Sequence, residues 1–64
     1  MRSLLNVRLA EARMTKQELK RLTGISHNAL WNYSKDEGIG VAPLRSLVRI
    51  ADAIGCKVTD LYQE

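Results

Sequence analysis

The sequence predicts an all-α fold of four or five short helices, and three kinds of observation support it. Apolar residues recur at three- and four-residue spacing along most of the chain, as they do on one face of a helix. No run alternates apolar and polar residues over a length that suits a strand. Thr15, Ser26 and Pro43 are typical of helix starts, and Gly24 and Gly55 are typical of helix ends.

The first two helices are predicted from their apolar faces and from one cap. The first runs over about 4–13. The second begins at Thr15, because Thr15 and Glu18 form an S/T-x-x-E capping box, and it ends at Gly24. The residues expected to face inward are Leu5, Leu9 and Ala12 in the first helix and Leu19 and Leu22 in the second.

The remaining elements follow from similar signals. Ser26 can cap a third helix, residues 35–42 contain glycines and are predicted to form a loop, and Pro43 suits the first turn of a fourth helix. Thr59 can cap a last helical turn over 60–63. The residues expected to face inward are Leu30, Tyr33, Leu44, Leu47, Val48, Ala51, Ile54 and Leu61.

Positive charge is concentrated in one segment of the chain. Residues 13–35 carry five basic side chains and one acidic side chain, a net of +4, whereas the whole chain has a net charge of +3. A local positive field on a short pair of helices suits a polyanionic partner such as nucleic acid.

The composition excludes several other classes of function. One cysteine and one histidine can form neither an intramolecular disulfide nor a structural zinc site, and no metal or cofactor is expected. An enzyme is the poorest fit, since no carboxylate pair lies near a nucleophile and no glycine loop is suited to hold phosphate. No apolar run approaches membrane-spanning length and no secretory signal is evident, which favours a reducing cytoplasm.

The segment between the second and third helices contains the most specific motif. Gly24 has the backbone freedom that a tight turn between crossing helices needs, and Ile25 would fill the angle between them. MTKQEL, the GIS turn and IADAIG…DL together resemble the Cro/repressor-type (XRE) family of bacterial and phage transcription regulators. The resemblance covers nearly the whole chain, with the helix-turn-helix at about 15–35.

This resemblance implies a compact lambda-repressor-like domain over residues 1–64, with the helix over about 26–34 in the DNA major groove. On matching positions, the implied base contacts are Ser26, His27, Asn28, Trp31 and Asn32. The candidates for contacts with the DNA backbone are Arg13, Lys16, Lys35 and Arg45. The side-chain chemistry suits these roles, since an asparagine amide can bond adenine and an indole can pack on a thymine methyl group.

The expected function is therefore sequence-specific binding of double-stranded DNA as a small transcriptional regulator, here a repressor. One short helix covers only a few base pairs, so a homodimer on a pseudo-palindromic operator is expected. The apolar candidates for the two-fold contact are Ile39, Val41, Val58 and Tyr62. No small-molecule effector is expected, and the expected location is the cytoplasm of a bacterium, at the nucleoid, for a bacterial or phage-encoded protein.

A protein-interaction module of the same fold, such as an antitoxin, is the alternative. Lys20 stands where the family usually has alanine packed beneath the second motif helix, and an exposed Trp31 marks a contact with DNA or with protein. In the alternative, both residues belong to a protein interface. Salt separates the two functions, because phosphate-driven binding weakens steeply as the salt concentration rises.

Overall fold

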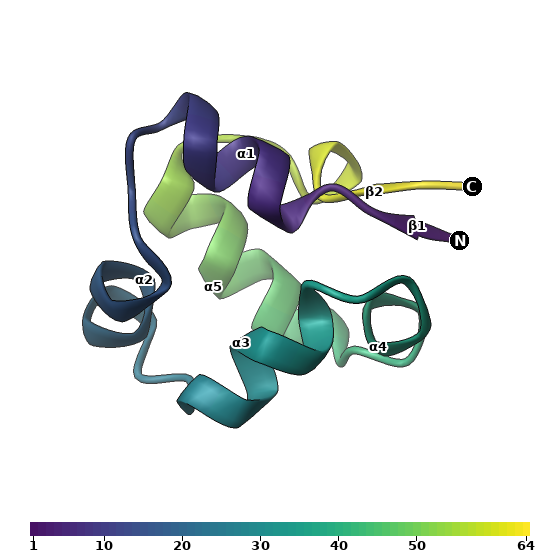
Figure 1. The fold of residues 1–64 in the computed structure, drawn as a ribbon, viewed down its shortest axis with the longest axis horizontal. Helices are drawn as coiled ribbons and strands as arrows, with labels where there is room; N and C mark the ends of the chain where they lie inside the picture. Colours follow the sequence, from purple (N-terminus) through teal and green to yellow (C-terminus); the bar gives the residue numbers. More distant parts are fainter.

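The computed structural model describes all of residues 1–64, and it is mostly helical (Figure 1). The five α-helices are α1 (Leu5–Glu11), α2 (Lys16–Thr23), α3 (His27–Tyr33), α4 (Asp36–Gly40) and α5 (Leu44–Ile54). A 3-10 turn, η1 (Val58–Asp60), leads into strand β2 (Tyr62–Gln63), which pairs with strand β1 (Arg2–Ser3). The predicted compact helical fold is confirmed, and the short strand pair is an addition to it. Even the longest helix, α5 with 11 residues, is too short to span a bilayer.

One hydrophobic core joins the five helices to the C-terminal segment. Helix α5 crosses the middle of the molecule in Figure 1 and contacts both α2 and η1. Burying one leucine or isoleucine side chain contributes about 1.5–3 kcal/mol, so each of these side chains accounts for a large share of the small net stability of a domain of this size. The buried residues are all apolar: Leu5, Leu9, Leu19, Leu30, Ile39, Leu47, Ile50, Ala51 and Leu61.

Four residues predicted to face inward are exposed. Leu22, Leu44 and Val48 are 51%, 68% and 42% exposed, and Ala12 is exposed as well. Ala12 follows the last residue of α1 and so leaves the apolar face of that helix. In α5 the buried residues are Leu47, Ile50 and Ala51. Leu44 lies one turn before them at the helix start, and Val48 lies on the flank.

Thr23, rather than Leu22, completes the inner side of α2. Its hydroxyl donates a hydrogen bond to the carbonyl of Leu19 at 2.7 Å and accepts one from the N–H of Ile25 at 3.2 Å. These two bonds satisfy the hydroxyl, so a half-buried polar residue is accommodated next to the core.

Residues 35–42, predicted to form a loop, contain helix α4. Lys35 is the N-cap residue, and Asp36 and Glu37 lie in the first turn, where the helix dipole favours acidic side chains. Ile39 is 3% exposed and belongs to the core, instead of projecting from a loop as predicted. Two glycines in five residues give this segment a low helix propensity, and burial of Ile39 outweighs it.

The glycines of the chain serve two different purposes. Gly24 and Gly55 have positive φ values of 72° and 88°, and no atom lies within 4 Å of the position that a β-carbon would take. Gly38 allows α4 to approach α3 closely, because a β-carbon there would overlap the backbone carbonyl of Asn32.

The two chain ends pair with each other, and the N-terminal strand also bonds to the end of α3 and the start of α4. Arg2 pairs with Gln63 and Ser3 pairs with Tyr62 in the antiparallel β1–β2 ladder, and the termini are adjacent in Figure 1. Ser3 also donates its hydroxyl to the carbonyl of Tyr33 at 2.6 Å and its N–H to the Asp36 carboxylate at 2.8 Å. Strands of two residues leave no alternating pattern in the sequence, which is why they were not predicted.

The C-terminal turn differs from the prediction. Its 3-10 helix η1 starts after Lys57, whose N–H donates to the Asp60 carboxylate at 3.0 Å. The predicted helical turn over 60–63 with Thr59 as its cap is wrong, because η1 already contains Thr59 and Asp60 and because Tyr62 and Gln63 form β2. Leu61 is fully buried, as predicted.

Alanine substitutions should have different effects at a glycine with positive φ, such as Gly24, and at the closely packed Gly38. Gly24→Ala should lower the free energy of unfolding by about 1–2 kcal/mol, because an L-residue is strained in the left-handed conformation. Gly38→Ala should have a larger effect, since the backbone of Asn32 must move to accommodate a β-carbon.

Gly40→Ala is the matched control in α4, because a β-carbon at Gly40 meets only the sulfur of Met1, at 3.9 Å. Its stability should equal or exceed that of the wild type, since alanine has the higher helix propensity. Urea unfolding of the three variants measures the differences. Equal losses at positions 38 and 40 would contradict the close approach of α4 to α3.

Candidate nucleic-acid interface

A three-residue turn joins α2 to α3 and sets the direction of α3. Gly24 ends α2 with φ 72° and ψ 7°, and its N–H donates to the carbonyl of Lys20 at 2.8 Å. Ile25 packs against the core. The hydroxyl of Ser26 accepts the N–H of Ala29 at 3.2 Å and so caps α3. The end of one helix and the start of the next are therefore defined within the same turn.

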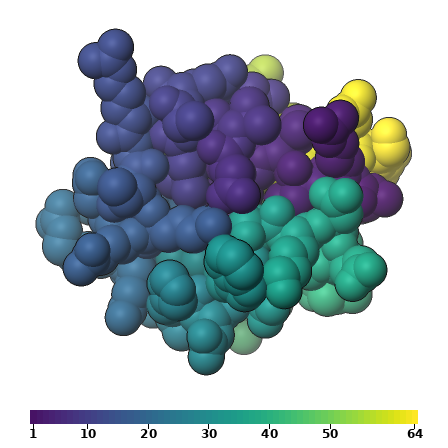
Figure 2. All heavy atoms as spheres, viewed as in Figure 1, coloured from purple at the N-terminus to yellow at the C-terminus, as the bar shows by residue number.

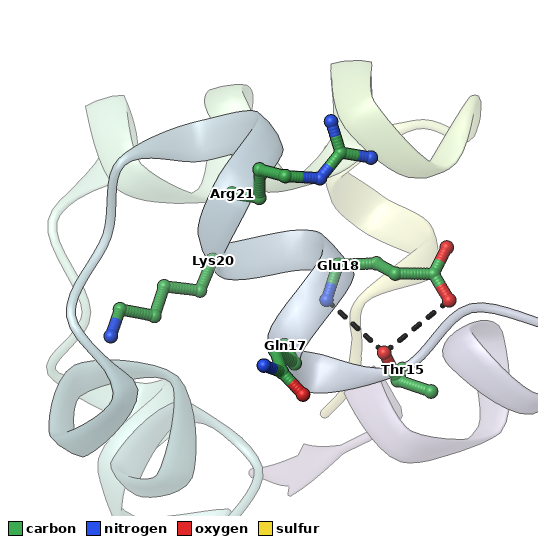
Figure 3. Close-up of a pocket in the computed structure, with 5 residues that line it drawn as sticks. All are labelled: Thr15, Gln17, Glu18, Lys20 and Arg21. Atoms are coloured by element: carbon green, nitrogen blue, oxygen red, sulfur yellow. Dashed lines mark hydrogen bonds between the residues drawn. The ribbon is translucent and has the colours of Figure 1, made fainter.

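The start of α2 is held by the Thr15 cap that the sequence predicted. The hydroxyl of Thr15 accepts the N–H of Glu18 at 3.1 Å, and it donates to the Glu18 carboxylate at 3.4 Å (Figure 3). The Glu18 carboxylate accepts from the Thr15 hydroxyl and not from the Thr15 N–H, so only half of the predicted capping box forms. An acidic side chain in the first turn is also favoured by the helix dipole.

Helix α3 separates an inner face from an exposed polar face. Leu30 is fully buried and Tyr33 packs against the core. The exposed side has Asn28, Trp31 and Asn32 at three- and four-residue spacing, which places them on one face. The helix contains no acidic residue, so its exposed face presents hydrogen-bonding groups without repelling an anion. All five residues predicted to contact bases are exposed: Ser26, His27, Asn28, Trp31 and Asn32.

The two lysines predicted to contact the DNA backbone, Lys16 and Lys35, both lie over the ring of Trp31. The Nζ of Lys16 lies 4.9 Å from the centroid of the Trp31 ring, and the Nζ of Lys35 lies 5.3 Å from it. Both distances are within the range of cation–π attraction. The sequence did not predict this lysine–tryptophan cluster, formed by Lys16, Trp31 and Lys35. The spacing of Lys35 four residues after Trp31 hints at their contact, whereas Lys16 has no such local signal.

Polar residues of α2 and of its N-cap form part of the exposed surface. Thr15, Gln17, Glu18, Lys20 and Arg21 line a shallow depression of about 560 Å³, with no apolar residue in its lining. The Lys20 side chain extends outward from α2 (Figure 3), so its ammonium remains in water beside α3. The space-filling view shows α2 and α3 side by side along one margin of the molecule (Figure 2).

Arg13 lies in the connection from α1 to α2 and has an unusual backbone conformation. Its φ of 54° makes it the only non-glycine residue with a positive φ. The N–H groups of Arg13 and Met14 donate to the carbonyls of Ala10 and Leu9 at 3.1 and 2.9 Å, the pattern of a Schellman helix end. Glycine is the usual residue at this position, so Arg13 provides a basic side chain at the expense of backbone strain.

Arg45, the remaining backbone candidate, is exposed in the first turn of α5. It therefore lies on a different helix from the two helices of the turn motif.

No group of three or more His, Cys, Asp or Glu side chains is placed to hold a metal ion. Burial raises the pKa of the Cys56 thiol, which disfavours a nucleophilic thiolate.

A capped helix, a glycine turn and a second helix with an exposed polar face define a helix-turn-helix protein. Residues 4–63 match the family model described as the Cro/C1-type HTH DNA-binding domain, and the chain belongs to that family. This match confirms the predicted family. Membership implies DNA binding by a non-enzymatic domain, in agreement with the prediction that the chain is not an enzyme. Searches of curated proteins and of solved structures returned no match.

Arg13→Gly is expected to raise the free energy of unfolding by about 0.5–1 kcal/mol. The strain of an L-residue in the left-handed region, about 1–2 kcal/mol, outweighs the added freedom of glycine in the unfolded chain, about 0.5–1 kcal/mol. Urea unfolding checks this value. Arg21→Gly within α2 is the control and should lose about 1 kcal/mol. A loss of stability in Arg13→Gly would contradict the strain assigned to this residue.

Proposed function

We propose that this protein is a small transcriptional regulator, a repressor, that binds double-stranded DNA sequence-specifically. In this proposal residues 1–64 act as a single helix-turn-helix domain with the motif at about 15–35, and residues 26–34 enter the major groove. The observation that carries the proposal is the exposed face of α3, which bears amide, imidazole and indole side chains and no acid. Family membership supports DNA as the partner.

The exposed amides are the proposed readers of sequence. Asn28 and Asn32 lie one turn apart on the outer side of α3, and each can bond N6 and N7 of adenine through two hydrogen bonds. His27, at the first position of α3, can donate to a base or a phosphate. The Ser26 hydroxyl accepts the Ala29 N–H, and its own proton is free to bond a phosphate oxygen. Trp31 is exposed on the same face, and the family resemblance is what implies a base contact for it.

The basic side chains are the proposed contacts with the DNA backbone. Lys16 begins α2 and Lys35 follows α3, so the two ammonium groups come from opposite ends of the motif. Arg13 and Arg45 would bind phosphates on either side. Such contacts hold the protein in register without distinguishing sequences, and each one contributes to a salt dependence of binding.

A homodimer on a pseudo-palindromic operator completes the proposal, because two half-sites enlarge a small footprint. An apolar groove of about 190 Å³ lies between the N-terminus, α4 and the start of α5, and Met1, Leu44, Val58 and Tyr62 are among its lining residues. Leu44 is 68% exposed, and Val41, next to the groove in the chain, is 82% exposed. Contiguous exposed apolar side chains favour a protein contact at this surface.

The proposed mechanism is occlusion of a promoter by the bound dimer in the bacterial cytoplasm, at the nucleoid, with no cofactor and no small-molecule effector.

The apolar groove lined by Met1, Leu44, Val58 and Tyr62 also favours a second candidate function, a protein-interaction module such as an antitoxin with weak or no DNA binding. The two candidates differ in their response to salt, since an apolar protein contact does not weaken as phosphate contacts do.

Selection of bound sequences from random duplex DNA tests the proposed reading of sequence. Asn28→Ala should relax the preference at one or two base positions, with a loss of about 1–3 kcal/mol there. Lys16→Ala should weaken binding to all sequences about equally. Lys57→Ala, on the exposed surface before η1, is the matched control and should leave both affinity and preference unchanged.

The outcome of this selection decides between the two candidates. If the wild type enriches no duplex at low salt, the protein is not a sequence-specific reader, and the interaction module becomes the better assignment. If Asn28→Ala leaves the enriched sequence unaltered, the assignment of Asn28 as a reader is wrong.

Leu44→Asp is expected to convert a wild-type dimer into a monomer, because a carboxylate would then be buried at the proposed two-fold contact. Val7→Asp is the control, since Val7 is 46% exposed on α1 and does not line the groove. Sedimentation of the free and the operator-bound protein gives the oligomeric state. A wild type that binds its operator as a monomer, or a dimeric Leu44→Asp, would contradict the proposed contact.

A further inference from the structure

The lysine–tryptophan cluster links the two helices of the motif at their outer surface. Lys16 is the first residue of α2, Trp31 is in α3, and Lys35 follows α3. Both ammonium groups lie over the Trp31 ring, at 4.9 and 5.3 Å from its centroid. These two distances place the ammonium groups no more than about 10 Å apart.

No carboxylate neutralises either lysine. The one ion pair in the structure joins Arg8 to Glu11, on α1. The acidic groups nearest in sequence have other partners, because Glu18 accepts the Thr15 hydroxyl and Asp36 accepts the Ser3 N–H. The cluster is therefore a pair of like charges held together by an aromatic ring and left without a counter-ion.

This arrangement does not suit Trp31 as a reader of thymine. A methyl group packs against the face of an indole, and both lysines lie over that ring. Packing a base on a face that a lysine covers would displace that ammonium group from an attraction that favours it. Trp31 is 51% exposed, so the cluster is nevertheless open to a partner.

We propose that Trp31 is a positioning residue, whose ring holds Lys16 and Lys35 as a two-point clamp for DNA phosphates. This inference rests on the proposed DNA-binding function and changes the role of Trp31 within it. An ammonium group has three donors, so contact with the ring leaves donors available for phosphate oxygens. Each strand of a duplex carries one charge per about 3.4 Å of axis, so two ammonium groups within about 10 Å of each other can both contact phosphates at once.

Holding the lysines in advance also improves binding. A free lysine side chain loses rotamer freedom when it is immobilised on a phosphate, and a pre-ordered side chain loses less. The ring therefore strengthens contacts that carry no sequence information. Trp31 should affect affinity for all duplexes while base preference remains with the asparagines.

The geometry is tested first in the free protein by NMR. The ε-methylene protons of Lys16 and Lys35 should be shifted upfield by the ring current of Trp31, whereas those of Lys57 should have ordinary shifts. The upfield shifts should vanish in Trp31→Leu, which keeps apolar bulk and removes the aromatic face. Ordinary shifts for both lysines in the wild type would overturn the cluster.

The function of the clamp is tested by affinity for the selected duplex and for duplexes with altered bases, at several salt concentrations. Trp31→Leu should weaken binding to every duplex by about 5- to 30-fold, because two lysine side chains that the ring holds in advance must then be ordered during binding, with base preference unchanged. Trp31→Phe retains an aromatic face and should lose less. In a Lys16→Met, Lys35→Met background, Trp31→Leu should have little further effect, whereas in Lys57→Met it should have its full effect.

Each result has a distinct meaning. A changed preference at one base pair in Trp31→Leu shows that Trp31 reads a base, and an unchanged affinity shows that the ring does not assist the lysines; either result overturns the clamp. If the wild type itself binds no duplex, the proposed DNA-binding function fails and the clamp fails with it. A wild type that binds, with uniform weakening in Trp31→Leu, supports both.

Discussion

The left-handed turn at Gly24 is the constraint on which the exposed face of α3 depends. Leu19 from α2 and Leu30 from α3 are both fully buried in one core, although only three residues separate the two helices. The two faces of a helix cannot rotate independently. Burial of Leu30 therefore directs Asn28 and Asn32 outward, and the core fixes the orientation of the surface that is proposed to read DNA.

Helix α3 is supported at both of its ends. At its start, the Ser26 hydroxyl caps the helix by accepting the Ala29 N–H. At its end, Ser3 of β1 donates to the Tyr33 carbonyl, and α4 approaches closely through Gly38. The short ladder between the chain ends holds β1 in place. A rigid, supported helix loses little conformational entropy on binding, which favours affinity and precise placement of its side chains.

The charge distribution complements this geometry. The excess of basic side chains lies in residues 13–35, and the single ion pair of the structure, Arg8 with Glu11, lies outside that segment. The positive field of the motif is therefore not cancelled within the protein and can attract a polyanion at a distance. Arg13 adds to this positive field from a strained backbone position, where glycine would be more stable.

The caps at Thr15 and Ser26 and the turn at Gly24 could be predicted from the sequence, because these features depend on residues within one helical turn of each other. Helical spacing also predicted that Leu30 is buried. Three other features could not be predicted in this way: 36–40 is helical, Leu44 is exposed, and Lys16 lies over Trp31. Each of these depends on packing between segments far apart in the chain, which local propensity and periodicity do not record.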